Sequence, residues 1–268
     1  MPLGIVPVAL LLCSGAVVGV LLGLIGGGGS VLAVPLLVYL VGVPSAHVAI
    51  GTSAVAVALN AASGLATHAR LGTVKWPCAL VFSAAGVAGA FLGASLGKQL
   101  GGTELLALFG LLMIGIGLYM LWLRPKHVGH DVRLTPETAA HLLPRLLAFG
   151  LGVGLLSGFF GIGGGFLIVP GLMLATGMGL QNAIGTSLFA VTAFGATTAS
   201  SYAASGLVDW RLALLVIAGG IAGSLLGTHV NARLAPRRHA LSTTFAGVVI
   251  AVGLYVAVRG FGQLLALG

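Results

Sequence analysis

Acidic side chains are nearly absent from this 268-residue chain, which has four Asp and Glu beside twelve Lys and Arg. Charged residues make up 6% of the sequence, whereas soluble globular proteins carry about 25%. So few charges cannot solvate the surface of a chain this long, and a hydrophobic content of 58% makes lipid its natural solvent. A separate soluble catalytic or nucleic-acid-binding domain is therefore excluded. The net charge of +8 does not indicate nucleic acid, because the basic residues stand singly between apolar stretches.

Cysteine is equally scarce. Cys13 and Cys78 both lie in apolar surroundings, which excludes a disulfide framework and a cysteine metal site. The few acids fall in loops or at segment ends: Glu104, Asp131, Glu137 and Asp209. A cation pump or a carboxylate proton relay normally needs an acid deep in the membrane, so both are disfavoured. We expect neither a metal nor a cofactor.

Apolar runs fill the chain instead. Glycine clusters, prolines and isolated charges divide it into ten segments: 5–25, 30–42, 46–69, 76–97, 103–123, 144–160, 165–177, 182–204, 211–230 and 240–258. A membrane-spanning helix needs roughly 20 apolar residues. We therefore expect an all-α polytopic membrane protein with about 8–10 transmembrane segments.

The second half of the chain repeats the first at a spacing of 134–135 residues. Four blocks match in register: GGGGSVLAVP (26–35) with GIGGGFLIVP (161–170), IGTS (50–53) with IGTS (184–187), GTVKW (72–76) with GLVDW (206–210), and GVAG (86–89) with GIAG (220–223). These matches predict a duplicated bundle with a first repeat at 1–124 and a second at 144–268. The polar stretch 125–143 links the two.

The basic residues favour inverted repeats. An odd number of crossings per repeat places Lys98, Arg211 and Arg259 on one side of the membrane and nine basic residues on the other: Arg70, Lys75, Arg124, Lys126, Arg133, Arg145, Arg233, Arg237 and Arg238. An even number divides them only eight against four. Positive charges gather in cytoplasmic loops, so we expect a cytoplasmic linker and both termini outside.

The second segment of each repeat is short. At ~1.5 Å per residue, 30–42 and 165–177 each reach near 20 Å, less than the ~30 Å hydrocarbon core. Each segment is either a thin tilted span or part of a re-entrant hairpin folded about the glycines.

The two glycine clusters are the main candidates for a substrate site. A glycine run breaks a helix, and the freed N–H groups must then face protein, water or a ligand. A run that leads into a new helix offers N–H donors and a positive dipole end, which suits an anion. Matched interruptions in both halves of a transporter point to its binding site. The candidate ligands are Gly27, Gly28, Gly29, Ser30, Gly163, Gly164 and Gly165. Close helix packing is the alternative.

Hydroxyl and amide groups form a second candidate set. Thr52, Ser53, Thr186 and Ser187 either donate to a bound anion or bond carbonyl groups of their own helix. Asn60 shares a helix face with Ser63 and Thr67, and such a polar face lines either a cavity or a hydrogen-bonded helix seam. The evenly spaced glycines of two later segments indicate close helix contact instead: Gly86, Gly89, Gly93, Gly220, Gly223 and Gly227.

These motifs resemble the TauE/SafE sulfite exporter family of bacterial and archaeal permeases. The resemblance rests on the paired Gly-to-Pro blocks, the doubled Gly-Thr-Ser, GLVDW at 206–210 and GGIAGSLLG at 219–227, and it covers about residues 10–258. It implies a plasma-membrane permease for sulfite, sulfoacetate, related sulfonates or thiosulfate, often in the direction of export. Lys75 departs from the acidic-Trp pattern that Asp209 keeps.

The leading hypothesis is a secondary transporter in the lipid bilayer that moves a small sulfur-containing or organic anion by alternating access. Protons carried by histidine and sodium held by backbone carbonyls are both compatible as coupling ions, as is a homo-oligomer. The alternatives are a transporter for a non-sulfur solute and a structural or assembly subunit of a membrane complex. An enzyme is disfavoured, because no histidine lies deep in the membrane beside Ser157, Ser187 or Ser201.

Overall fold

The computed structural model describes residues 5–25, 27–122, 136–161, 163, 165–234 and 238–267. These residues form helices joined by short turns. The elements in order are α1 (Ile5–Ile25), the 3₁₀-helix η1 (Gly27–Leu32), α2 (Ala33–Pro35), the π-helix η2 (Leu36–Leu40), α3 (Ala46–Arg70), α4 (Trp76–Gly97), α5 (Gly102–Trp122), α6 (Pro136–Phe160), α7 (Gly165–Thr176), α8 (Leu180–Ala204), α9 (Trp210–Leu234) and α10 (Arg238–Leu267).

Within this described part, eight helices are long and apolar enough to cross a membrane: α1, α3, α4, α5, α6, α8, α9 and α10. This confirms the prediction of an all-α polytopic membrane protein. Three helices extend by four or more residues beyond their predicted segments: α6 begins at Pro136, eight residues before 144, α9 continues to Leu234, four residues past 230, and α10 continues to Leu267, nine residues past 258. The predicted bounds followed hydropathy, whereas helical hydrogen bonds continue outside lipid and proline suits the first position of a helix.

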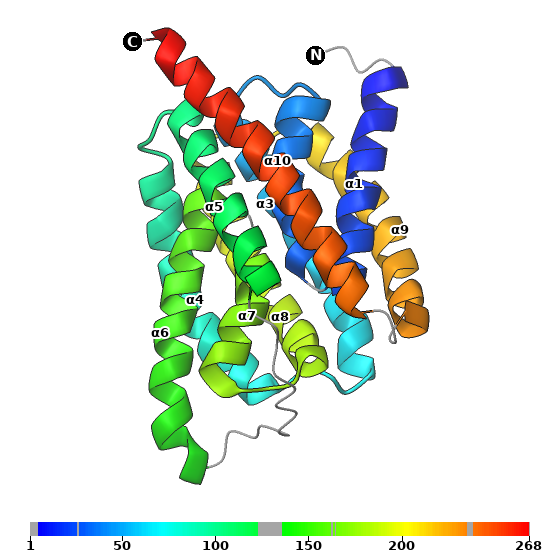
Figure 1. Ribbon diagram of the computed structural model, residues 1–268, viewed down its shortest axis with the longest axis vertical. Helices are drawn as coiled ribbons and strands as arrows, with labels where there is room; N and C mark the ends of the chain where they lie inside the picture. The colour runs from blue at the N-terminus through cyan, green and yellow to red at the C-terminus, as the bar shows by residue number, and fades with distance from the viewer. Residues whose placement is uncertain are drawn as a thin grey trace.

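Equivalent helices of the two halves run in opposite directions. In Figure 1, α1 runs downward and α6 upward, and likewise α5 runs downward and α10 upward. We call the end of the bundle where α10 finishes the upper end, and the end where α6 begins the lower end. The start of α3 also lies at the upper end, because Ala46 faces Gly102 at the start of α5.

The basic residues divide between these two ends. Lys98 follows α4 and Arg211 begins α9 at the upper end, whereas Arg70 and Lys75 flank the α3–α4 turn at the lower end. Four of the residues that entered the sequence-based topology lie outside the described part of the chain: Arg124, Lys126, Arg133 and Arg237.

The two halves are interleaved rather than side by side. Helix α1 packs along α9, and α4 packs along α6. These two pairs are equivalent, because α1 aligns with α6 and α4 with α9. Two further pairs, α3 with α8 and α5 with α10, each join aligned helices. Every helix long enough to span the membrane therefore has its main partner in the other half.

Glycine allows the α4–α6 and α1–α9 pairs to approach closely. A Cβ atom added at Gly89 or Gly93 of α4 would collide with a backbone carbonyl oxygen of α6. Added at Gly223 or Gly227 of α9, it would collide with a carbonyl oxygen of α1. Backbones that meet without intervening side chains are typical of helix association in lipid. The predicted close contact is confirmed at these four glycines.

Candidate functional site

The chain turns back into the bundle at the second glycine cluster. Helix α6 ends at Phe160 and α7 begins at Gly165. Between them, Gly161 and Gly163 each have a φ of +66°, a conformation that only glycine adopts readily. The helix interruption predicted here is therefore present. Gly164, also a predicted site residue, lies outside the described residues.

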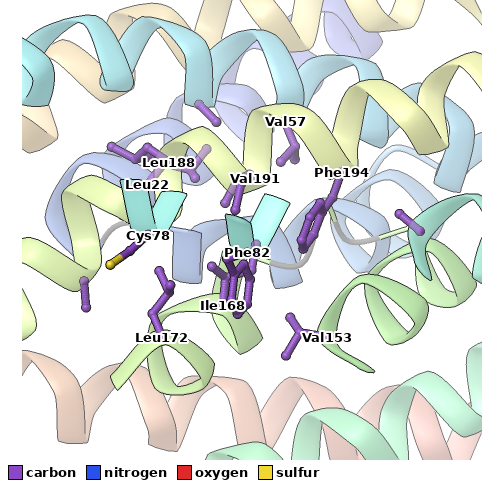
Figure 2. Packing of buried hydrophobic residues seen from close by; sticks show 14 of the residues in the cluster. Leu22, Val57, Cys78, Phe82, Val153, Ile168, Leu172, Leu188, Val191 and Phe194 are labelled. Atoms are coloured by element: carbon purple, nitrogen blue, oxygen red, sulfur yellow. The ribbon is translucent and has the colours of Figure 1, made fainter. Parts of the chain in front are cut away.

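Gly163 lies at mid-depth between α3 and α8. A Cβ atom there would be 2.8 Å from Cγ1 of Val57 and 3.6 Å from Cγ1 of Val191. Val57 is the twelfth of the 25 residues of α3, and Val191 is the twelfth of the 25 residues of α8. Figure 2 shows both valines in the central core, together with Phe82 and Phe194. The turn thus faces the middle of the two helices that the bundle buries most.

The first glycine cluster also interrupts its helix, but in a different way. Helix α1 ends at Ile25, and Gly27 and Gly28 open the 3₁₀-helix η1. Gly29 packs on α1, where an added Cβ would lie 2.6 Å from the carbonyl oxygen of Val18. Ser30 is fully buried. Because η1 contacts both α7 and α8, the two interrupted segments meet inside the bundle.

The two Gly-Thr-Ser motifs make equivalent contacts across the halves. Oγ1 of Thr52 in the first half accepts a hydrogen bond from the backbone N–H of Asp209 at 3.0 Å. Oγ1 of Thr186 in the second half accepts one from the backbone N–H of Lys75, also at 3.0 Å. Each threonine therefore holds the turn that precedes the Trp-led helix of the opposite half. We call these two bonds the upper clamp (Thr52–Asp209) and the lower clamp (Thr186–Lys75).

The glycine and serine beside each threonine support this structural role. A Cβ atom added at Gly51 or Gly185 would collide with the turn of the opposite half that its clamp holds. Ser53 Oγ donates to the carbonyl oxygen of Ile50 at 2.9 Å, and Ser187 Oγ donates to its counterpart Ile184 at 2.8 Å. Both serines thus bond their own helix, which is the alternative that the sequence left open.

Thr52 and Thr186 are too far apart to share one small anion. Each lies five residues before the central valine of its helix, which is about 7.5 Å along the axis at 1.5 Å per residue. Because α3 and α8 run in opposite directions, these offsets add to about 15 Å. A direct ligand role for the threonines stays a prediction, and the mid-depth candidates are the Gly163 turn, η1 and Asn60.

Replacing either clamp threonine with valine should lower the thermal midpoint of unfolding. Valine keeps the shape but removes the acceptor of a part-buried hydrogen bond. A fully buried N–H that loses its partner costs about 1–3 kcal/mol, which is the upper bound for the change. Thr52→Ser, which keeps a hydroxyl, is the control. The measurement is thermal unfolding in detergent for Thr52→Val and Thr186→Val, and an unchanged midpoint in both would show that neither clamp contributes to stability.

Asn60 carries a buried side-chain amide. It lies one turn from Val57 in α3 and is 0% exposed, and neither Oδ1 nor Nδ2 has a hydrogen-bond partner among the described residues. Its amide lies against Gly220 of α9, where an added Cβ would collide with it. A buried polar group without a hydrogen bond costs about 1–3 kcal/mol by protein mutational data. Such a group calls for an explanation, and binding of a ligand by this amide is one.

The aligned position in the second half is apolar. Phe194 faces Gly86 of α4 just as Asn60 faces Gly220 of α9, and its ring stacks on Phe82 with centroids 6.1 Å apart. An aromatic ring therefore fills the same kind of space that the amide fills in the first half. The pairing shows that packing alone does not require a polar side chain at residue 60.

Lys98 forms a polar cluster that sequence reasoning missed. Its Nζ donates to the backbone oxygen of Ser201 at 3.1 Å, to Ser201 Oγ at 2.9 Å and to Ser205 Oγ at 3.0 Å. The sequence alone indicated only a loop cation, because the two serines lie more than a hundred residues away. The spacing of the serines, one helical turn apart, is the single signal that the sequence contains.

Comparison with known proteins agrees with this architecture. The family described as "Sulfite exporter TauE/SafE" matches residues 11–256. A "Probable membrane transporter protein" of Xylella fastidiosa (strain Temecula1) is 48% identical over 256 residues, covering 94% of this chain and 96% of the relative. The "Probable membrane transporter protein YunE" of Bacillus subtilis is 30% identical over 242 residues, covering 84% and 89%. No solved structure shows a significant match to this chain.

Proposed function

Since the chain belongs to the sulfite exporter TauE/SafE family of membrane transporters, we propose that it carries a small sulfur-containing or organic anion, such as sulfite or a sulfonate, across the plasma membrane. The observation that carries this proposal is the pair of helix interruptions that meet inside the bundle, with Gly163 between Val57 and Val191. Matched broken segments at mid-depth are where inverted-repeat transporters bind their substrates.

The chemistry of this region suits an anion. The first turns of η1 and α7 supply backbone N–H groups, and the N-terminal end of a helix carries partial positive charge. The Asn60 amide adds a side-chain donor one turn from Val57. Sulfite and sulfonates present three oxygens on one sulfur, so several N–H donors can bind them at once. A cation as the main cargo would normally need a carboxylate deep in the membrane. The acids in the described residues, Glu104, Glu137 and Asp209, lie instead at the starts of α5, α6 and α9.

The arrangement of helices supports alternating access between inverted halves. Aligned helices run in opposite directions, and the helix pairs of one half recur in the other. One clamp ties α3 to the second half at the upper end, and its equivalent ties α8 to the first half at the lower end. We expect the clamp at an end to break when that end opens. With the linker cytoplasmic, the lower end faces the cytoplasm.

A counterflow assay tests the proposal. Purified protein is reconstituted into liposomes loaded with unlabelled anion, and entry of external labelled sulfite, thiosulfate or sulfoacetate is followed. We expect saturable exchange that empty liposomes lack, for at least one of these anions. No exchange for every sulfur oxyanion and sulfonate tried would overturn the proposed substrate class, and exchange of small carboxylates alone would favour a non-sulfur organic anion. Imposed proton and sodium gradients then identify the coupling ion.

A further inference from the structure

At the upper end of the bundle, a second set of hydrogen bonds joins the two halves in addition to the upper clamp. We call such a connection between the halves a tie. Lys98, directly after α4, bonds Ser201 in the last turn of α8 and Ser205 directly after that helix, with three hydrogen bonds of 2.9–3.1 Å. It therefore joins the first half of the chain to the second. Its Nζ also lies 5.8 Å from the ring centroid of Tyr202, whose side chain is fully buried. Hydrogen bonds from a charged donor are stronger than neutral ones. The two bonds to Ser201 are part-buried, and the bond to Ser205 is exposed.

The aligned positions at the lower end cannot form this tie. At the repeat spacing of 134 residues, Lys98 aligns with Ala232, Ser201 with Thr67 and Ser205 with Leu71. Alanine has no donor and leucine has no acceptor in the side chain. The clamps, by contrast, are equivalent at the two ends, each with an N···O distance of 3.0 Å. Lys98 therefore adds to the upper end a tie that these lower-end positions lack.

We propose that Lys98 is a latch that keeps the upper end closed in the empty carrier, so that the carrier opens first at the lower end. This inference rests on the proposed alternating access. A two-state equilibrium shifts by the difference in interactions between its states, so a tie that the aligned positions at the lower end lack biases the carrier toward opening at the lower end. With the lower end cytoplasmic, the resting carrier loads its anion from the cytoplasm, which is the orientation that export requires.

Two reporter cysteines distinguish the ends. Ala49 of α3 and Ala183 of α8 occupy aligned positions near opposite ends, and both are 0% exposed. Each becomes reactive only when its own end opens. Ala49→Cys and Ala183→Cys are made separately in a full-length background with Cys13→Ala and Cys78→Ala. A water-soluble maleimide is added to open membrane sheets, so that it reaches both ends, and the two labelling rates are compared.

Without the latch, the reporter at the upper end should react faster. We expect Ala183→Cys to label faster than Ala49→Cys in the parent protein. Lys98→Met should raise the labelling rate at Ala49→Cys at least about tenfold relative to that at Ala183→Cys. Lys98→Arg should keep most of the parent ratio, because it keeps the charge and the donors. Arg211→Met removes an exposed charge at the same end and should leave the ratio unchanged.

The remaining outcomes distinguish a failure of the latch proposal from a failure of the proposed transport function. If both reporters react and sulfite changes their rates, but Lys98→Met leaves the ratio unchanged, the latch is overturned while transport stands. If neither reporter reacts with or without anion, alternating access fails and the latch fails with it. If Lys98→Met does not fold, Ser205→Ala replaces it, since it removes one of the three acceptors, and it should shift the ratio in the same direction by a smaller factor.

Discussion

Gly154→Leu is expected to yield no folded protein, whereas Gly152→Leu in the same helix should fold normally. A Cβ atom at Gly154 would collide with the carbonyl oxygen of Gly86, which is backbone of α4 and cannot move aside without separating the two helices. Nothing lies within 4 Å of the Cβ position at Gly152. The two positions differ in what they face rather than in local sequence.

The measurement is the yield of monodisperse protein after extraction and the thermal midpoint of unfolding. Overpacking a close-packed core costs about 1–3 kcal/mol for modest additions, and leucine adds four carbon atoms against a backbone. Gly154→Ala should give an intermediate result. Gly152→Ala should be neutral or slightly stabilising, because alanine is the better helix former. Equal midpoints for Gly154→Leu and Gly152→Leu would show that α4 and α6 do not pack through these glycines.

Asn60→Leu is expected to slow transport strongly without destabilising the protein. Leucine has nearly the same branched shape but no donor or acceptor, so it removes a buried amide that has no hydrogen-bond partner among the described residues. Replacing such a group with an apolar one is neutral or stabilising. A hydrogen bond to a charged ligand is worth about 1.5–3 kcal/mol, so the exchange rate should fall roughly 10- to 150-fold.

The transport result and the stability result together test whether Asn60 belongs to the substrate site. Counterflow in liposomes measures transport, and thermal unfolding measures stability in the same preparation. Ser83→Ala is the control, because Ser83 is also buried and its Oγ has no hydrogen-bond partner in the described part of the chain, but it is not one of the proposed site residues. Ser83→Ala should leave transport unchanged. Wild-type transport by Asn60→Leu would remove Asn60 from the substrate site, and a large loss of stability would show that the amide has a structural partner.

Much of the fold was predictable because it depends on local chemistry. Hydropathy located the membrane-spanning segments, and the glycine clusters located both helix interruptions, since glycine weakens a helix wherever it stands. The glycines of α4 and α9 were correctly assigned to helix contact from their spacing alone.

The roles of the hydroxyl groups were not predictable in the same way. A threonine within an apolar helix has the same sequence signature whether it faces a ligand or a neighbouring turn. Thr52 bonds Asp209 across 157 residues, and Thr186 bonds Lys75 across 111. No local pattern identifies a partner that far along the chain. Lys98 was read as a loop charge for the same reason.

The sequence by itself therefore determined that the chain lies in lipid, which segments form helices and where helices break, because each of these depends on residues within a few positions of one another. Only the tertiary structure decided which apolar faces meet, which threonines hold turns of the opposite half and which amide is buried against a neighbouring helix. In the linear sequence, helix faces of similar hydropathy cannot be told apart. Which faces pack together depends on how closely the helix backbones can approach one another once the two halves interleave.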